Sequence, residues 1–401
     1  MPLELVAIAL ISLFIGGQIN RGIYRLAWHK RTISPWSKPP AQTAPRTALD
    51  RIPILGWWRL RRESSLHGEG FWLRPMVIEL GLAAGLVTLY WLEMQRGLYP
   101  LGSLPIADSV IRAQFLSHAI LICFMTVATF IDLDEQTIPD EITIPGTLIG
   151  LLLAAVLPIS LLPAWSELPP PIVTSPLWLS QPNPWPADLQ GAKGLSIGLA
   201  CIVGWWYAML PKTLWYRSGS RKFVRYLLAS IGRHRGTLLM TGLALATSAA
   251  SVAVWWRGGL AWQGLLTSLV GMAAGGSVIW LVRIVASLAL GQEAMGFGDV
   301  TLMGMIGAFV GWQPSLIIFF LAPFAGVIIA ISQWILTQRK DIAYGPFLSL
   351  ATILLILFWP AIWNRWGIPV FAMGWFVPLV FGVCLILLGI LLVLIRAVRP
   401  R

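Results

Sequence analysis

Long apolar segments alternate with short polar ones along most of this 401-residue chain. A helix needs about 20 apolar residues to cross a bilayer. Runs of this kind are centred near residues 3–20, 76–95, 110–131, 142–162, 192–211, 237–256, 263–290, 314–337, 345–363 and 370–396. A shorter run covers 300–312. The pattern predicts an all-α polytopic membrane protein with about ten or eleven transmembrane helices.

The composition agrees with this pattern and excludes a soluble globule. Hydrophobic residues make up 57% of the chain, charged residues 11%, and the mean hydropathy is +0.75. The net charge of +12 comes largely from basic loops, above all the one between Asn20 and Pro75. Such loops stay on the cytoplasmic side of polytopic proteins. A second basic loop at 212–235 falls on the same side when the spans are counted forward. Because the basic residues flank spans and form no single patch, we expect no nucleic-acid partner.

Two short motifs place carboxylates beside apolar segments. Asp132 ends the third span, and Asp299 begins the short run at 300–312. Charged groups in such positions are costly and usually mark function. On the predicted topology both acids lie at the cytoplasmic surface, where they can meet. Gly296 and Gly298 precede Asp299 and predict a tight turn or a close approach of another segment.

Two neighbouring carboxylates in a partly dry site cannot both be ionised easily, so they share a proton. One can then deprotonate a water while the other protonates a peptide carbonyl, which is aspartic proteolysis. Asp134 stands two residues after Asp132 and stays an alternative to it. A simpler interpretation is that these acids cap helices, which applies most to Asp140 at the start of the fourth span.

The motifs resemble those of a known family. The segment Ile131–Pro145 resembles the first signature of type IV prepilin peptidases, and Glu293–Asp299 resembles their second, the GxGD signature. Four more segments match in family order: Gly16–Leu26, Asp50–Trp57, Arg74–Leu80 and Tyr344–Phe347. The resemblance implies that Asp132 and Asp299 are the catalytic pair of a GxGD aspartic protease. It also implies a supporting set: Gly296, Gly298, Asp134, Pro139, Asp140, Gly345 and Pro346.

The resemblance implies a specific activity at the inner membrane. Family members cleave the leader peptides of type IV prepilins or type II secretion pseudopilins at the cytoplasmic face, and some then methylate the new N-terminus from S-adenosylmethionine. The expected partners are therefore these precursors and the lipid bilayer. Bifunctional members carry two Cys-x-x-Cys pairs, where this chain has Ser34–Ser37 and Ser64–Gly68. Without thiolates we expect no zinc or other metal site, and methyltransfer is left open.

The sequence suggests five segments. They are an N-terminal region with the basic loop at 1–107, the first catalytic helices at 108–160, an inserted loop and helix pair at 161–260, the GxGD helices at 261–363 and an additional C-terminal helix at 364–401. Other functions stay open. One is a GxGD protease of other membrane substrates, and one is a transporter or ion-coupled channel that uses the aspartates as proton or cation sites. The last is a catalytically silent scaffold.

Overall fold

The structure is a computed structural model that describes residues 2–31, 33–40, 43–95, 97–165, 171–210, 230, 233–337 and 343–398. Within these residues, seven helices are long and apolar enough to cross a membrane, or eight if one bent pair forms a single span. The prediction of an all-α polytopic fold is confirmed. The central part of the second basic loop, with Lys212 to Arg225, lies outside the described residues, as do Arg339 and Lys340.

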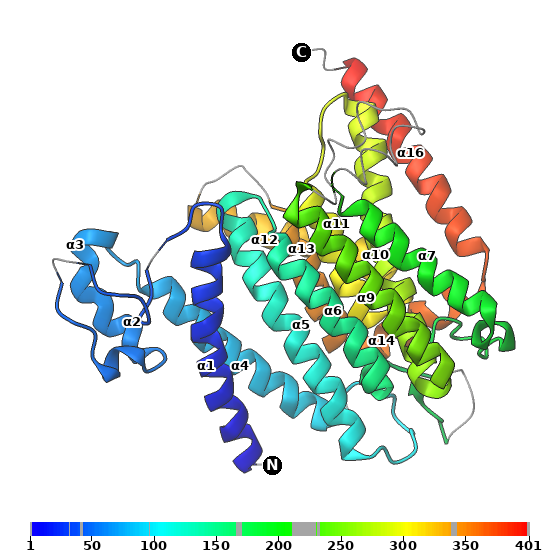
Figure 1. Cartoon of the computed structure of the whole chain (residues 1–401), viewed down its shortest axis with the longest axis horizontal. Coiled ribbons are helices and arrows are strands. Elements are labelled where there is room, and N and C mark those ends of the chain that lie inside the picture. The colour runs from blue at the N-terminus through cyan, green and yellow to red at the C-terminus, as the bar shows by residue number, and fades with distance from the viewer. Residues whose placement is uncertain are drawn as a thin grey trace.

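Within the described residues, eleven helices build the bundle (Figure 1): α1 (Pro2–Leu26), α4 (Leu73–Met94), α5 (Asp108–Glu135), α6 (Asp140–Val156), α7 (Ala192–Ala208), α9 (Arg235–Arg257), α10 (Gly259–Leu290), α11 (Phe297–Val310), α12 (Trp312–Thr337), α13 (Gly345–Leu357) and α16 (Phe376–Val398). Short elements connect them: η1 (Ala48–Arg51), α2 (Leu55–Leu60), η2 (Arg61–Glu63), α3 (Ser64–His67), η3 (Pro158–Ser160), η4 (Ala187–Gln190), α14 (Trp359–Ile362), the π-helix η6 (Trp363–Gly367) and α15 (Ile368–Ala372). Two short antiparallel strands, β1 (Pro163–Ala164) and β2 (Ser175–Pro176), complete the described elements.

Helices α6 and α7, with 17 residues each, reach the lower limit for a membrane span. Their length accounts for the higher number of transmembrane helices predicted from the sequence.

The bundle has two distinct ends, and Figure 1 shows the N-terminus at the lower one and the C-terminus at the upper one. At the lower end, tryptophan indole N–H groups donate hydrogen bonds to backbone carbonyls of the connecting segments. Trp359 donates to the Pro163 carbonyl at 2.7 Å, and Trp262 donates to the Leu189 carbonyl at 2.7 Å. Tryptophan suits such positions because its ring is apolar while its N–H needs a partner. The upper end carries both aspartate motifs and is called the aspartate end below.

Helix α11 lies in the core, and its residues 299–310 are all buried. It packs against α10 at very short range. A Cβ on Gly271 would collide with the Gly307 carbonyl oxygen, and a Cβ on Gly307 would collide with that of Gly271. The small residues of α10 therefore permit close helix packing, as small residues do between membrane helices. This packing fixes the helix whose first turn carries Asp299.

Candidate active site

Asp132 lies in the last turn of α5 and is 5% exposed. Its Oδ2 accepts a hydrogen bond from the Gly345 N–H at 2.9 Å. Gly345 is the first residue of α13, and a helix N-terminus favours a negative charge. A Cβ on Gly345 would stand 2.7 Å from this oxygen, so only glycine lets the helix end approach the carboxylate. The adjacent Pro346 occupies the first turn, where its missing N–H costs no hydrogen bond.

Asp299 lies in the first turn of α11 and is 8% exposed. It interacts electrostatically with Asp132. Ile138 of the first motif lies next to Gly298 of the second motif and also next to Gly345, the residue that donates to Asp132. The structure thus brings the two predicted aspartates to one buried site. Their catalytic role stays a prediction.

The two glycines before Asp299 differ in function. Gly296 is the N-cap of α11, with φ −65° and ψ 152°, and the nearest atom to an added Cβ is 3.8 Å away. Gly298 has no such room, because its Cβ would stand 2.8 Å from the Ile138 Cβ. Neither glycine has a positive φ, and of the two only Gly298 shows the predicted close approach of another segment. The left-handed residue near the aspartates is Gln136, the C-cap of α5, with φ 54°.

Asp134 does not share the site of Asp132 and Asp299, and it pairs with an arginine instead. Both of its oxygens accept hydrogen bonds from Arg74 at 2.8 Å, and its side chain is 28% exposed. Arg74 also donates to the Phe130 carbonyl, so it ties α4 to the end of α5. Pro139 is the N-cap of α6, and Asp140 is its first residue. These three predicted supporting residues therefore shape the turn between α5 and α6.

Glu79 joins three of the segments on which the resemblance rests. It accepts hydrogen bonds from the Ile54 N–H at 2.6 Å, the Trp57 indole at 2.8 Å and the Asn20 amide at 3.3 Å. Its side chain is buried at 1% exposure. A buried acid among basic loops suggests an arginine partner, yet these donors are all uncharged. The glutamate anchors the first loop to α1 and α4.

The first loop itself is held by buried ion pairs. Arg46 binds Glu63, and Asp50 accepts hydrogen bonds from Arg59 at 2.8 Å and Arg62 at 2.9 Å. Burial alone would raise the pKa of Asp50, but hydrogen bonds from the Thr47 backbone and from the two arginines outweigh it and hold the pKa well below its usual range. Among the residues that the structure describes, no group of three or more His, Cys, Asp or Glu side chains is placed to hold a metal ion.

Comparisons with known proteins point to one family. The model of the type IV leader peptidase family matches residues 119–170 and 235–331, which contain Asp132 and Asp299 respectively. A prepilin leader peptidase/N-methyltransferase from Aeromonas salmonicida is 34% identical over 121 residues, 27% of this chain and 41% of that protein. Proteins of the same name from Escherichia coli K12 and Pseudomonas aeruginosa are 34% identical over 89 residues and 35% identical over 78.

These matches are partial. The Escherichia coli match covers 22% of this chain and 40% of that protein, and the Pseudomonas aeruginosa match covers 19% and 26%. The chain thus matches at most about two fifths of the length of these relatives. No solved structure matches it significantly. Helix α7 lies between the two segments that the family model matches.

Proposed function

We propose that this chain, a member of the type IV leader peptidase family through residues 119–170 and 235–331, is a membrane aspartic endopeptidase that removes leader peptides from type IV prepilins or type II secretion pseudopilins. The observation that carries the proposal is the buried site that Asp132 and Asp299 share, one from each matched segment. The relatives' printed names support the substrate class.

The contacts of the two aspartates suggest different roles. Asp132 accepts the backbone N–H of Gly345 at a helix N-terminus, which favours its charged form. Asp299 lies in an apolar helix beside this charge, so it is the partner that holds the shared proton. Asp132 takes a proton from water, and the hydroxide adds to the peptide carbonyl as Asp299 gives its proton to the carbonyl oxygen. When the intermediate collapses, the C–N bond breaks, Asp132 protonates the leaving amine, and Asp299 recovers its proton from the hydroxyl group.

We place the aspartate end at the cytoplasmic face of the inner membrane. Helix α1 ends there with Arg25, and Lys30 and Arg31 follow it. Loops rich in lysine and arginine stay in the cytoplasm. A precursor whose basic leader also stays in the cytoplasm would meet the aspartates where its apolar helix enters the bilayer.

Methyltransfer has less support than proteolysis. The relatives are named as N-methyltransferases as well, but the first loop lies outside the segments that the family model matches. A hollow between this loop and α1 and α4, lined by Gly17, Trp36, Trp57 and Glu79 among others, has a volume of about 10 Å³. That volume fits one water and not S-adenosylmethionine. We therefore derive no methyl-transfer step from this structure.

The test is cleavage of a co-expressed prepilin or pseudopilin from the same genome by the wild type and by Asp132→Asn, Asp299→Asn and Asp134→Asn. We expect cleavage to be lost in the first two variants and kept in the third, which is the matched control from the same motif. Mass spectrometry of the product would also reveal methylation as a gain of about 14 Da. An inserted precursor left intact by the wild type would refute the proposal and favour the transporter or scaffold alternatives.

A further inference from the structure

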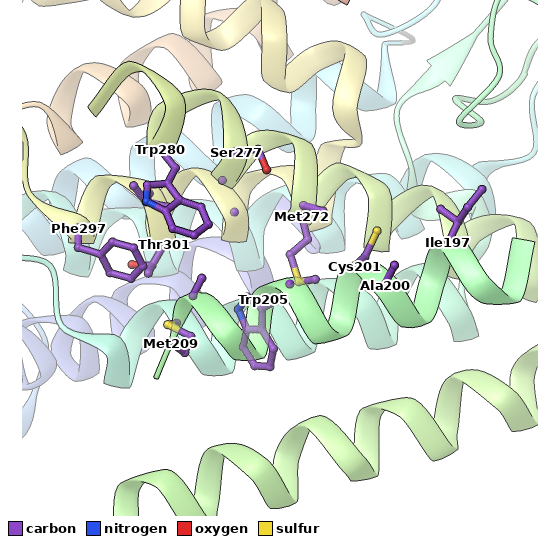
Figure 2. A pocket seen from close by; sticks show the side chains of 16 residues that line it. Ile197, Ala200, Cys201, Trp205, Met209, Met272, Ser277, Trp280, Phe297 and Thr301 are labelled. Atoms are coloured by element: carbon purple, nitrogen blue, oxygen red, sulfur yellow. The ribbon is translucent and has the colours of Figure 1, made fainter. Parts of the chain in front are cut away.

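An apolar cavity opens beside the aspartate end, between α7, α10 and α11. Its volume is about 410 Å³ (Figure 2). Small residues from the three helices line much of it: Ala200, Gly204 and Ala208 of α7, Ala273 and Gly276 of α10, and Gly304 of α11. We call it the α7 groove. The α10 residues that line it are neighbours of the glycines that pack against α11, so α10 uses one face for the core and another for the groove.

The groove reaches the first turn of α11, which also carries Asp299. Phe297, Val300 and Thr301 line it, and Asp299 lies between them in the first turns of α11. Figure 2 shows Phe297, Thr301 and Met209 at one end of the groove and Ile197 at the other. A ligand that fills the groove along α7 would therefore have one end beside Asp299.

Charged residues at the aspartate end indicate the chemical class of this ligand. Met209 also lines a second hollow of about 770 Å³ between α6 and α9. Asp140 and Glu141, at the start of α6, line that hollow as well, together with His234, the N-cap of α9. Two carboxylates disfavour an anionic lipid headgroup and favour a basic segment. The combination fits an apolar helix with a basic extension at its end near the aspartates.

We propose that the α7 groove binds the apolar helix that follows the scissile bond of the substrate, with the basic leader beside Asp140 and Glu141. The inference rests on the proposed function. Small side chains on three helices allow a fourth helix to approach closely, which is how helices associate in the absence of a hydrophobic driving force. One wall of this substrate site is α7, which lies outside the segments that the family model matches.

A native cysteine allows a direct test. Cys201 of α7 lines the groove, whereas Cys384 of α16 is exposed and Cys123 belongs to α5. Two enzymes would each keep a single cysteine, Cys201 or Cys384, and both must first be shown to cleave the precursor. Precursors with one cysteine at successive positions of the apolar helix are then oxidised together with each enzyme in the membrane. We expect disulfides with Cys201 at positions three to four apart, on one helix face, and at least about tenfold fewer with Cys384.

A second test blocks the groove. A Cβ on Gly204 meets nothing within 4 Å, so Gly204→Phe adds a ring to the groove without a backbone clash. Gly382 of α16 is equally open and lies outside the groove, which makes Gly382→Phe the matched control. We expect Gly204→Phe to raise KM at least about tenfold with little change in kcat, since it removes binding and no chemistry. The control should behave as the wild type.

The outcomes separate this inference from the proposed function. Cleavage with no disulfide to Cys201, or with equal disulfides to both cysteines, would place the substrate helix elsewhere and leave the peptidase intact. An unchanged KM in Gly204→Phe would also place the substrate helix elsewhere while leaving the peptidase proposal intact. It would suggest that a lipid fills the groove. No cleavage by the wild type would overturn both.

Discussion

The two glycines of the Gly296-Phe297-Gly298-Asp299 motif look equivalent in the sequence but should respond differently to the same substitution. In Gly298→Ala the new methyl group would stand 2.8 Å from the Cβ of Ile138, 3.1 Å from its backbone nitrogen and 3.3 Å from its Cα. In Gly296→Ala the nearest atom is an oxygen of Asp299 at 3.8 Å. The first change creates a clash with backbone atoms, and the second only fills open space.

The distance between the new Cβ of Gly298→Ala and Ile138 determines how strongly this substitution should affect activity. Ordinary contact begins at 3.4 Å, so relieving the contact of 2.8 Å requires a shift of 3.4 − 2.8, or 0.6 Å. Helix α11 is buried along residues 299–310, and such overpacking costs about 1–3 kcal/mol of stability. A misplacement of about 1 Å near reacting groups can lower a rate about 100-fold. We therefore expect Gly298→Ala to lower kcat roughly 10- to 100-fold and Gly296→Ala to change it less than about threefold.

Cleavage rates of purified variants in lipid vesicles would test this prediction, with thermal unfolding as a check on folding. A further control is Gly298→Ala combined with Ile138→Ala, which keeps the Cβ, N and Cα atoms that cause the clash. This double variant should not recover activity. Equal activity of the two glycine variants, or recovery in the double variant, would show that the contact with Ile138 does not position Asp299.

Three further predictions concern the surroundings of the site. Arg74→Gln should lower stability by less than about 1 kcal/mol in thermal unfolding, because the pair with Asp134 is 28–36% exposed and screened by solvent. The first loop should open in acid: the pKa of Asp50 is lowered in the folded protein, so its stabilisation is present above its ordinary pKa of 3.8 and is lost as the pH falls below it. Limited proteolysis of the loop should show this step, and Asp50→Asn should open the loop at neutral pH. EDTA should leave cleavage unchanged, whereas a dependence on added metal would contradict the two-aspartate mechanism.

The sequence predicted the helices and the meeting of the two motifs because both depend on strong, local signals. Runs of about 20 apolar residues fix the spans, and their number fixes which ends share a membrane surface. It could not separate Asp132 from Asp134, since that distinction depends on Arg74, 58 residues before Asp132, and on Gly345 far along the chain. It also could not distinguish Gly296 from Gly298, because only packing shows which of them Ile138 contacts.

The hydrogen-bond partners of Glu79 could not be predicted from the sequence for a similar reason. A buried acid near many arginines suggests an ion pair. The donors to Glu79 are instead the Ile54 backbone N–H, the Trp57 indole N–H and the Asn20 side-chain amide. Three arginines of the loop bind other acids: Arg46 binds Glu63, and Arg59 and Arg62 bind Asp50. Which charged group pairs with which is a property of the folded loop, and no spacing in the chain encodes it directly.

The missing thiolates predict no structural metal in the first loop, and its ion pairs are contacts that could link its parts instead. In the family's zinc-binding members four thiolates would link distant parts of the loop through one ion. Here Glu63 binds Arg46, and Asp50 binds Arg59 and Arg62, so two buried acids link residues 46–50 of the loop to residues 59–63. Trp57 and Leu60 of the same loop are also buried, at 1% and 0% exposure. Arg46 and Glu63 are both buried, and removing the arginine would cost about 3–5 kcal/mol, because the glutamate would lose its compensating charge. The loop therefore depends on these acids much as a zinc loop depends on its cysteines, and its stability should follow pH and not metal supply.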